Sequence, residues 1–208
     1  MKRLPLPVGI LAAVLAQAGI EAIAGVSVQL TQKDLQRATE LARWPHTDAE
    51  RAQFHKRYTF VVNGAVVEYF AVEKIEVTTP FRRMELIAEE HARINDLFAR
   101  GGVRDAVEAL RPWRDQVSIV AHLRFDLTKL IPGVPDVDFA LEGPRVVLPI
   151  VINNSGIYDR SQDRAQIIGG LVDAVFDVRD VGQTTGPVVV RWNGKEVARA
   201  AVDFAALE

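Results

Sequence analysis

PFRRMELIAEEHARINDLFAR, residues 80–100, is a long helical pattern that separates two strand-rich regions. Thr79 can cap the helix, Pro80 suits its first turn, and Gly101-Gly102 gives it a place to end. At about 100° per residue, one wide face carries Met84, Ile87, Ala88, His91, Ile94 and Phe98. The opposite face carries Arg82, Glu85, Glu89, Arg93, Asp96 and Arg100. We therefore expect one long central helix whose apolar face is buried.

Before this helix, the sequence predicts two short helices and a hairpin. Thr31 with Asp34, and Thr47 with Glu50, have the spacing of capping boxes. Residues 58–62 and 65–70 are apolar runs on either side of Asn63-Gly64, which is a strong signal for a tight hairpin turn.

After the central helix, we expect one short helix at residues 103–110 and then about six strands. The clearest strand is 116–127, where apolar and polar residues alternate. Others are expected at 136–142, 146–152, 170–178, 188–192 and 196–204, the last two joined by Asn193-Gly194. We interpret residues 153–156 as a turn. Helices and strands do not alternate, so we expect an α+β fold: an antiparallel sheet or sandwich packed against the central helix and the short N-terminal helices.

The first 24 residues have the order of a secretory signal peptide. Met1-Lys2-Arg3 is basic, an apolar run follows to about Ala16, and small residues then suit cleavage after Ala18 or, as we prefer, Ala24. A membrane anchor is the alternative, but Gln17 and Glu21 interrupt the run early. We expect an exported protein, periplasmic or secreted, with one α+β domain at 25–208. In this organisation the chain resembles bacterial exported proteins.

The charge of the chain limits its partners. The formal net charge is −2, and it becomes −3 without residues 1–24. No cluster of lysine and arginine stands out, which argues against nucleic acid and anionic membranes as partners. We expect no membrane span in the mature chain. With no cysteine, the chain forms no disulfides.

Few residues qualify for chemistry. His91 lies on the apolar face of the central helix, where it is either a proton-transfer or metal-binding group or, as we prefer, a buried structural histidine. His46 and His55 look like surface residues. His122, Arg124 and Asp126 line the polar face of the clearest strand. Four acids, Asp136, Asp138, Asp173 and Asp177, could converge into a calcium or glycosidase-like site, or simply carry outer-face charge.

The sequence contains no Gly-x-Ser-x-Gly, Walker loop or Gly-x-Gly-x-x-Gly motif. We therefore assign no catalytic, cofactor-binding or metal-binding residue and expect no cofactor. The preferred function is a non-enzymatic structural or interaction module of the cell envelope, with an envelope or extracellular partner. The first alternative is a small-molecule or lipid binder with a pocket between sheet and central helix, lined from among Phe70, Trp113, Phe139 and Phe176. The second is a carboxylate-based hydrolase.

Overall fold

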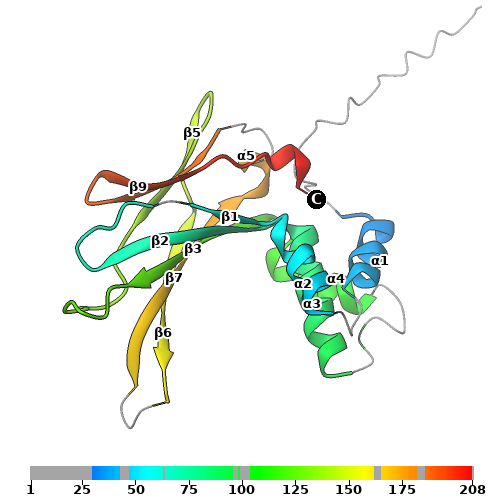
Figure 1. Cartoon of the computed structure of the whole chain (residues 1–208). Helices are drawn as coiled ribbons and strands as arrows, with labels where there is room; N and C mark the ends of the chain where they lie inside the picture. The colour runs from blue at the N-terminus through cyan, green and yellow to red at the C-terminus, as the bar shows by residue number, and fades with distance from the viewer. Residues whose placement is uncertain are drawn as a thin grey trace, which may run out of the picture.

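The computed structural model describes residues 30–42, 47–62, 64–95, 98, 104–161, 165–181 and 186–207. The expected signal peptide, with Ala18 and Ala24, lies outside these residues. The described chain is α+β, with two antiparallel sheets at one end and most of the helices gathered at the other (Figure 1). No helix in this part of the chain is both long and apolar enough to cross a membrane.

The larger sheet has five strands in the order β1-β2-β3-β7-β6. Their bounds are Thr59–Val61 for β1, Phe70–Thr78 for β2, Gln116–Phe125 for β3, Gln166–Asp177 for β7 and Val151–Asp159 for β6. The smaller sheet has the order β5-β4-β8-β9. Its bounds are Val146–Val147 for β5, Asp138–Glu142 for β4, Val188–Trp192 for β8 and Lys195–Ala200 for β9.

The described helices are short. They are α1 (Gln32–Leu41), α2 (Asp48–Lys56), α3 (Pro80–Arg93), α4 (Arg104–Leu110) and α5 (Val178–Val181), with 3₁₀ turns η1 (Arg111–Trp113) and η2 (Phe204–Ala206). Both expected capping boxes are confirmed. The Thr31 hydroxyl accepts from the Asp34 N–H, and the Thr47 hydroxyl accepts from the Glu50 N–H.

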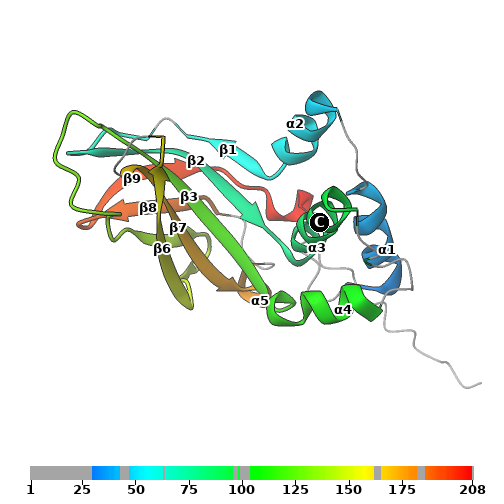
Figure 2. The same ribbon diagram turned by 90° about the horizontal axis from the view of Figure 1, so that it is seen from below.

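Two separate apolar cores hold the fold together. The inner faces of the two sheets pack on each other through β-branched and aromatic side chains such as Ile75, Ile119, Phe139 and Val190. The second core joins α1, α3 and α4 through residues that include Leu35, Phe81 and Met84. The expectation of a sheet packed against the central helix is therefore wrong. Each sheet covers the other, and the helices cover one another beside them (Figures 1 and 2).

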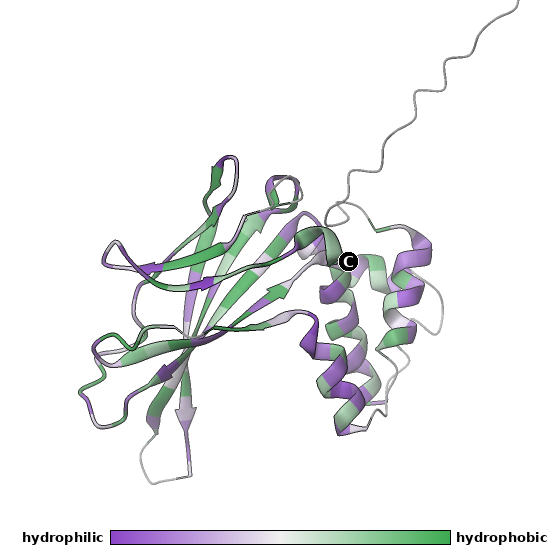
Figure 3. Ribbon diagram, turned by 45° about the horizontal axis from the view of Figure 1, so that its top comes forward, coloured by the Kyte–Doolittle hydropathy of each residue, from purple (hydrophilic) through white to green (hydrophobic). Residues whose placement is uncertain are grey.

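Helix α3 is shorter than expected, and its buried face is rotated. The helix ends at Arg93, and Asn95 follows in the left-handed region with φ 53°. Phe81, Met84, Glu85 and Ala88 form the buried stripe of the helix. Ile87 and Phe98 pack against the same core while partly buried, and Ile94, after the last helical residue, is exposed. Colouring by hydropathy shows purple bands on the helices and alternating colours along the strands (Figure 3).

Only one of the two Asn-Gly hairpins is confirmed. Asn193 and Gly194 have φ of 50° and 73° and join β8 to β9 in a two-residue turn. Asn63 lies outside the described residues, but β1 pairs with β2 from Thr59↔Glu76 to Val61↔Lys74, so the connection is too long for a tight turn at that point. A glycine is needed at position 64 because the backbone of β2 passes close to it. A Cβ there would lie 2.6 Å from the carbonyl oxygen of Val72.

The expected turn at 153–156 is the middle of a strand. Pro149 marks the place where the chain leaves the smaller sheet after β5 and joins the larger sheet as β6. β6 pairs with β7 from Val151↔Val175 to Asp159↔Gln166. The polar sequence Asn153-Asn154-Ser155-Gly156 suggested a turn, whereas polar residues here fit a strand at the edge of the sheet, where most of its side chains are exposed.

Candidate functional site

A group of charged side chains lies where α2, α3 and the outer face of the larger sheet meet. The outer face is the one turned away from the smaller sheet, and Figure 2 looks onto it. Alternation along β2 and β3 places Glu76 and His122 there, with Glu76 Oε2 3.2 Å from His122 Nε2. The hydrogen bond from His122 lowers the pKa of the Glu76 carboxyl. This pair is partly open to solvent.

Arg82 is the centre of the group and is fully buried. Its Nη1 donates to Glu85 Oε2 at 3.2 Å, and the side chains are 0% and 1% exposed. The guanidinium also lies 4.6 Å from the Phe54 ring centre and 4.7 Å from that of Tyr58. Tyr58 belongs to the core between the sheets, and Phe54 packs against the helical core. Arg82 therefore joins the two cores.

His55 extends the group from α2. Arg82 Nη2 forms a short contact with His55 Nδ1, and because arginine can only donate, Nδ1 accepts and the neutral ring carries its proton on Nε2. His55 Nε2 faces Glu89 Oε2 at 3.6 Å, and the Nε of Arg51 lies 3.6 Å from Glu89 Oε1. Partial burial and the charge of Arg82 lower the pKa of His55.

These contacts show what the group can do chemically. His55 cannot act as a base through Nδ1 while the guanidinium occupies that atom, and Arg82 forms an ion pair with a buried carboxylate. Oppositely charged groups alternate along the chain of contacts from Glu85 through Arg82 to Glu89 and Arg51. The contacts of His55 and Arg51 with Arg82 and Glu89 link α2 to α3.

A second polar contact joins Arg83 of α3 to Ser118 of β3, next to Trp113 in η1. Arg83 Nη2 donates to Ser118 Oγ at 2.9 Å, and its guanidinium lies 4.6 Å from the Trp113 ring centre. Nearby on β7, burial raises the pKa of Asp173, while the charge of Arg83 opposes that shift. One oxygen of Asp173 is buried and has no hydrogen-bond partner among the described residues. Arg83 and Trp113 mark the helical end of the outer face, where Ser118 is buried.

The four acids do not converge. Asp138 lies on β4 of the smaller sheet, opposite Arg191, and Asp136 precedes it and accepts from Asn154 at 2.8 Å. Asp173 and Asp177 lie on β7 of the larger sheet, four residues apart. Asp177 forms an ion pair with Arg179 that lowers its pKa to about 2. No group of three or more His, Asp or Glu side chains in the described ranges could hold a metal ion.

The histidines lie apart from one another. His91 is half-buried and stacks on Phe98, with ring centres 4.0 Å apart, so the expectation of a buried histidine in the helix face is wrong. His46 lies outside the described residues. His55 was expected at the surface, yet it contacts buried Arg82.

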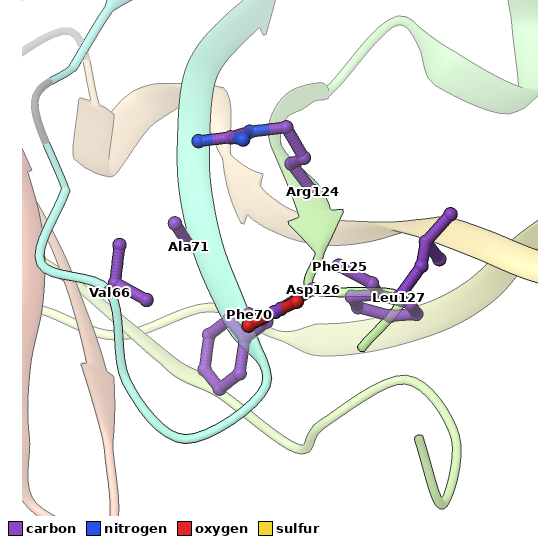
Figure 4. A pocket seen from close by; sticks show the side chains of 7 residues that line it. All are labelled: Val66, Phe70, Ala71, Arg124, Phe125, Asp126 and Leu127. Carbon is purple, nitrogen blue, oxygen red and sulfur yellow. The ribbon is translucent and has the colours of Figure 1, made fainter. Parts of the chain in front are cut away.

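One pocket lies at the end of β2 and β3 that is farther from α3. It has a volume of about 280 Å³ and is lined at the ends of β2 and β3 by Val66, Phe70, Ala71, Arg124, Phe125, Asp126 and Leu127 (Figure 4). This pocket does not lie between the sheet and α3, where the binder alternative places one. Phe70 lines the pocket, Phe139 and Phe176 are buried in the core, and Trp113 contacts Arg83.

The outer face of the larger sheet is largely uncovered. On β3 and β7 it exposes part of Val120 and Leu171, and on β6 it exposes Val151 and Ile157. Polar neighbours surround these four side chains: His122, Asp173, Asn153 and Ser155. In Figure 2 no helix crosses this part of the sheet.

Sequence reasoning missed Arg82, Glu85 and His55. Arg82 and Glu85 fall on the charged face of the helical pattern, and their spacing of three residues is the usual one for an exposed ion pair. A weak signal was available, because Phe54 and Tyr58 flank His55 closely in the sequence and offer aromatic faces to a cation.

The comparisons with known proteins add little. No family model and no curated protein matches the chain. One solved structure, from Burkholderia pseudomallei and described as a novel protein of unknown function, is 12% identical over 85% of this chain and 91% of that one. Its TM-score is 0.36. A likeness at this TM-score carries no conclusion about fold or function.

Proposed function

We propose that this chain is a non-enzymatic interaction module of the cell envelope. It is exported and binds another protein through the outer face of the larger sheet. The observation that carries the proposal is the partly exposed apolar group of Val120, Leu171, Val151 and Ile157 on that face. Apolar side chains ringed by polar ones are the usual composition of a protein interface, with a dry centre and a wet rim.

The described histidines and Arg82 have contacts that suit a structural role. The three described histidines each have a partner: His55 contacts Arg82, His122 contacts Glu76 and His91 stacks on Phe98. Arg82 is held by an ion pair with Glu85 inside α3 and contacts His55 of α2, so it links these two helices.

The test places a photo-crosslinking amino acid at Leu171 of the full chain in growing bacterial cells. A matched variant carries it at Lys195, which is exposed on the smaller sheet. We expect a discrete adduct at Leu171 but not at Lys195, recovered from the envelope fraction, with the mature N-terminus near Gly25. Equal labelling at both positions, or no adduct at Leu171, would refute the proposed surface. Retention of Met1 in a carbonate-resistant membrane pellet would refute export as a cleaved protein.

A further inference from the structure

β6 is an unusual edge strand. It has nine residues, and on the described chain it pairs with β7 alone. Its side chains are exposed or half-buried throughout, whereas at least half of the residues of β3 and of β7 are buried. An unpaired edge presents backbone N–H and C=O groups to any other strand that fits.

The other three sheet edges are protected and β6 is not. β1 has three residues and β5 has two, so both edges are short. β9 carries Lys195, Glu196 and Arg199, and such charges hinder pairing with another chain. From Val151 to Tyr158, β6 has no charged residue and no proline. The bulge at Ile157/Tyr158 in the β6–β7 pairing inserts its extra residue, Ile168, on β7 and leaves the free edge of β6 continuous from Val151 to Ile157.

The sequence of β6 is complementary to itself when it is read in the opposite direction. With Asn154 at the centre, an antiparallel copy would place apolar residues opposite apolar ones, in the pairs Ile150–Tyr158 and Val151–Ile157. Ile152 would face Gly156, and Asn153 would face Ser155. Cross-strand pairs of this kind stabilise sheets, and no two like charges of the β6 segment would face each other.

The exposed apolar side chains fit the same register. Among the described residues, Ile150 is 67% exposed, Val151 45%, Ile157 39% and Tyr158 53%. All four would gain an apolar partner in the pairing.

We propose that β6 pairs with β6 of a second copy of this chain, antiparallel and centred on Asn154. The two larger sheets then become one continuous sheet of ten strands around a two-fold axis. The inference goes beyond the proposed function, because it concerns contact between two copies and not the partner on the outer face. The dimer would place two copies of that face side by side.

The test introduces charges at Asn153 and Ser155, which face each other twice across the two-fold axis. In Asn153→Lys/Ser155→Lys, lysine faces lysine twice. In the matched variant Asn153→Lys/Ser155→Glu, lysine faces glutamate twice. Both positions are exposed, so we expect both variants to fold, which circular dichroism and the melting temperature check.

Sedimentation equilibrium of the purified chain gives the dimer dissociation constant. We expect a wild-type dimer, a dissociation constant at least about tenfold higher for the lysine–lysine variant than for the lysine–glutamate variant, and a dimer for the latter. A wild-type chain that stays monomeric up to about 1 mM, or equal dissociation constants for the two folded variants, would overturn the proposal. The crosslink at Leu171 is read independently, so failure of one proposal does not imply failure of the other.

Discussion

Replacing Arg82 by methionine tests the role of the buried ion pair. The change keeps a long apolar stem beside Phe54 and Tyr58 but removes the guanidinium that lies 3.2 Å from Glu85 and contacts His55. It leaves the Glu85 carboxylate, 1% exposed, without this cation.

The expected loss of stability follows from these contacts. Removing one partner of a buried ion pair costs about 3–5 kcal/mol, and the lost contacts of the cation with two rings add about 1 kcal/mol. Methionine restores part of the packing, so we expect a net loss of about 4 kcal/mol. That is a large part of the usual 5–15 kcal/mol stability of a domain.

Urea unfolding followed by circular dichroism measures this loss. The control is Arg82→Met/Glu85→Met, which removes both charges. It should be more stable than Arg82→Met alone, because no carboxylate is then left in the interior without its cation. A loss below about 1 kcal/mol for Arg82→Met, or a double variant less stable than the single one, would show that the pair does not behave as a buried ion pair.

Two further predictions concern pH and the confirmed turn. Burial and the charge of Arg82 lower the pKa of His55 in the folded state. Below about pH 6.5, the unfolded chain therefore binds a proton at His55 more readily than the folded chain does, and the free energy of unfolding should decrease as the pH falls. In urea titrations between about pH 7.5 and 5.5, His55→Gln should flatten this slope, and an unchanged slope would contradict the assignment. Gly194→Val should cost about 1 kcal/mol or more, because φ is 73° and no atom lies within 4 Å of its Cβ position, so the strain is in the backbone alone. The control Lys195→Val, at the residue after the turn, should have little effect on the free energy of unfolding. Equal urea midpoints for the two variants would argue against the turn geometry.

Local signals predicted the parts of the fold that depend on neighbouring residues. The two capping boxes, the strand at Gln116–Phe125 and the turn at Asn193-Gly194 follow from residues within a few positions of one another. The absence of βαβ alternation correctly favoured an α+β fold with antiparallel sheets.

The parts that failed depend on contacts far apart in the sequence. Whether residues 153–156 turn or extend is decided by pairing with β7. The packing of α1 and α4 decides which face of α3 is buried. Arg82 is buried beneath two aromatic rings, those of Phe54 in α2 and of Tyr58, which directly precedes β1. The acids at 136, 138, 173 and 177 share a chemistry but lie in two different sheets, which no spacing reveals.

The two apolar cores have a consequence for the motions of the molecule. No described residue belongs to both the core between the sheets and the helical core, and only Thr79 separates β2 from α3. The helices can therefore open without exposing the core of the sandwich, as a cooperative unit with its own free energy of opening. Amide hydrogens of α1 and α4 would then exchange with solvent earlier than those of β3 and β7. Arg82, which touches aromatic rings of both cores, is where such an opening would have to begin.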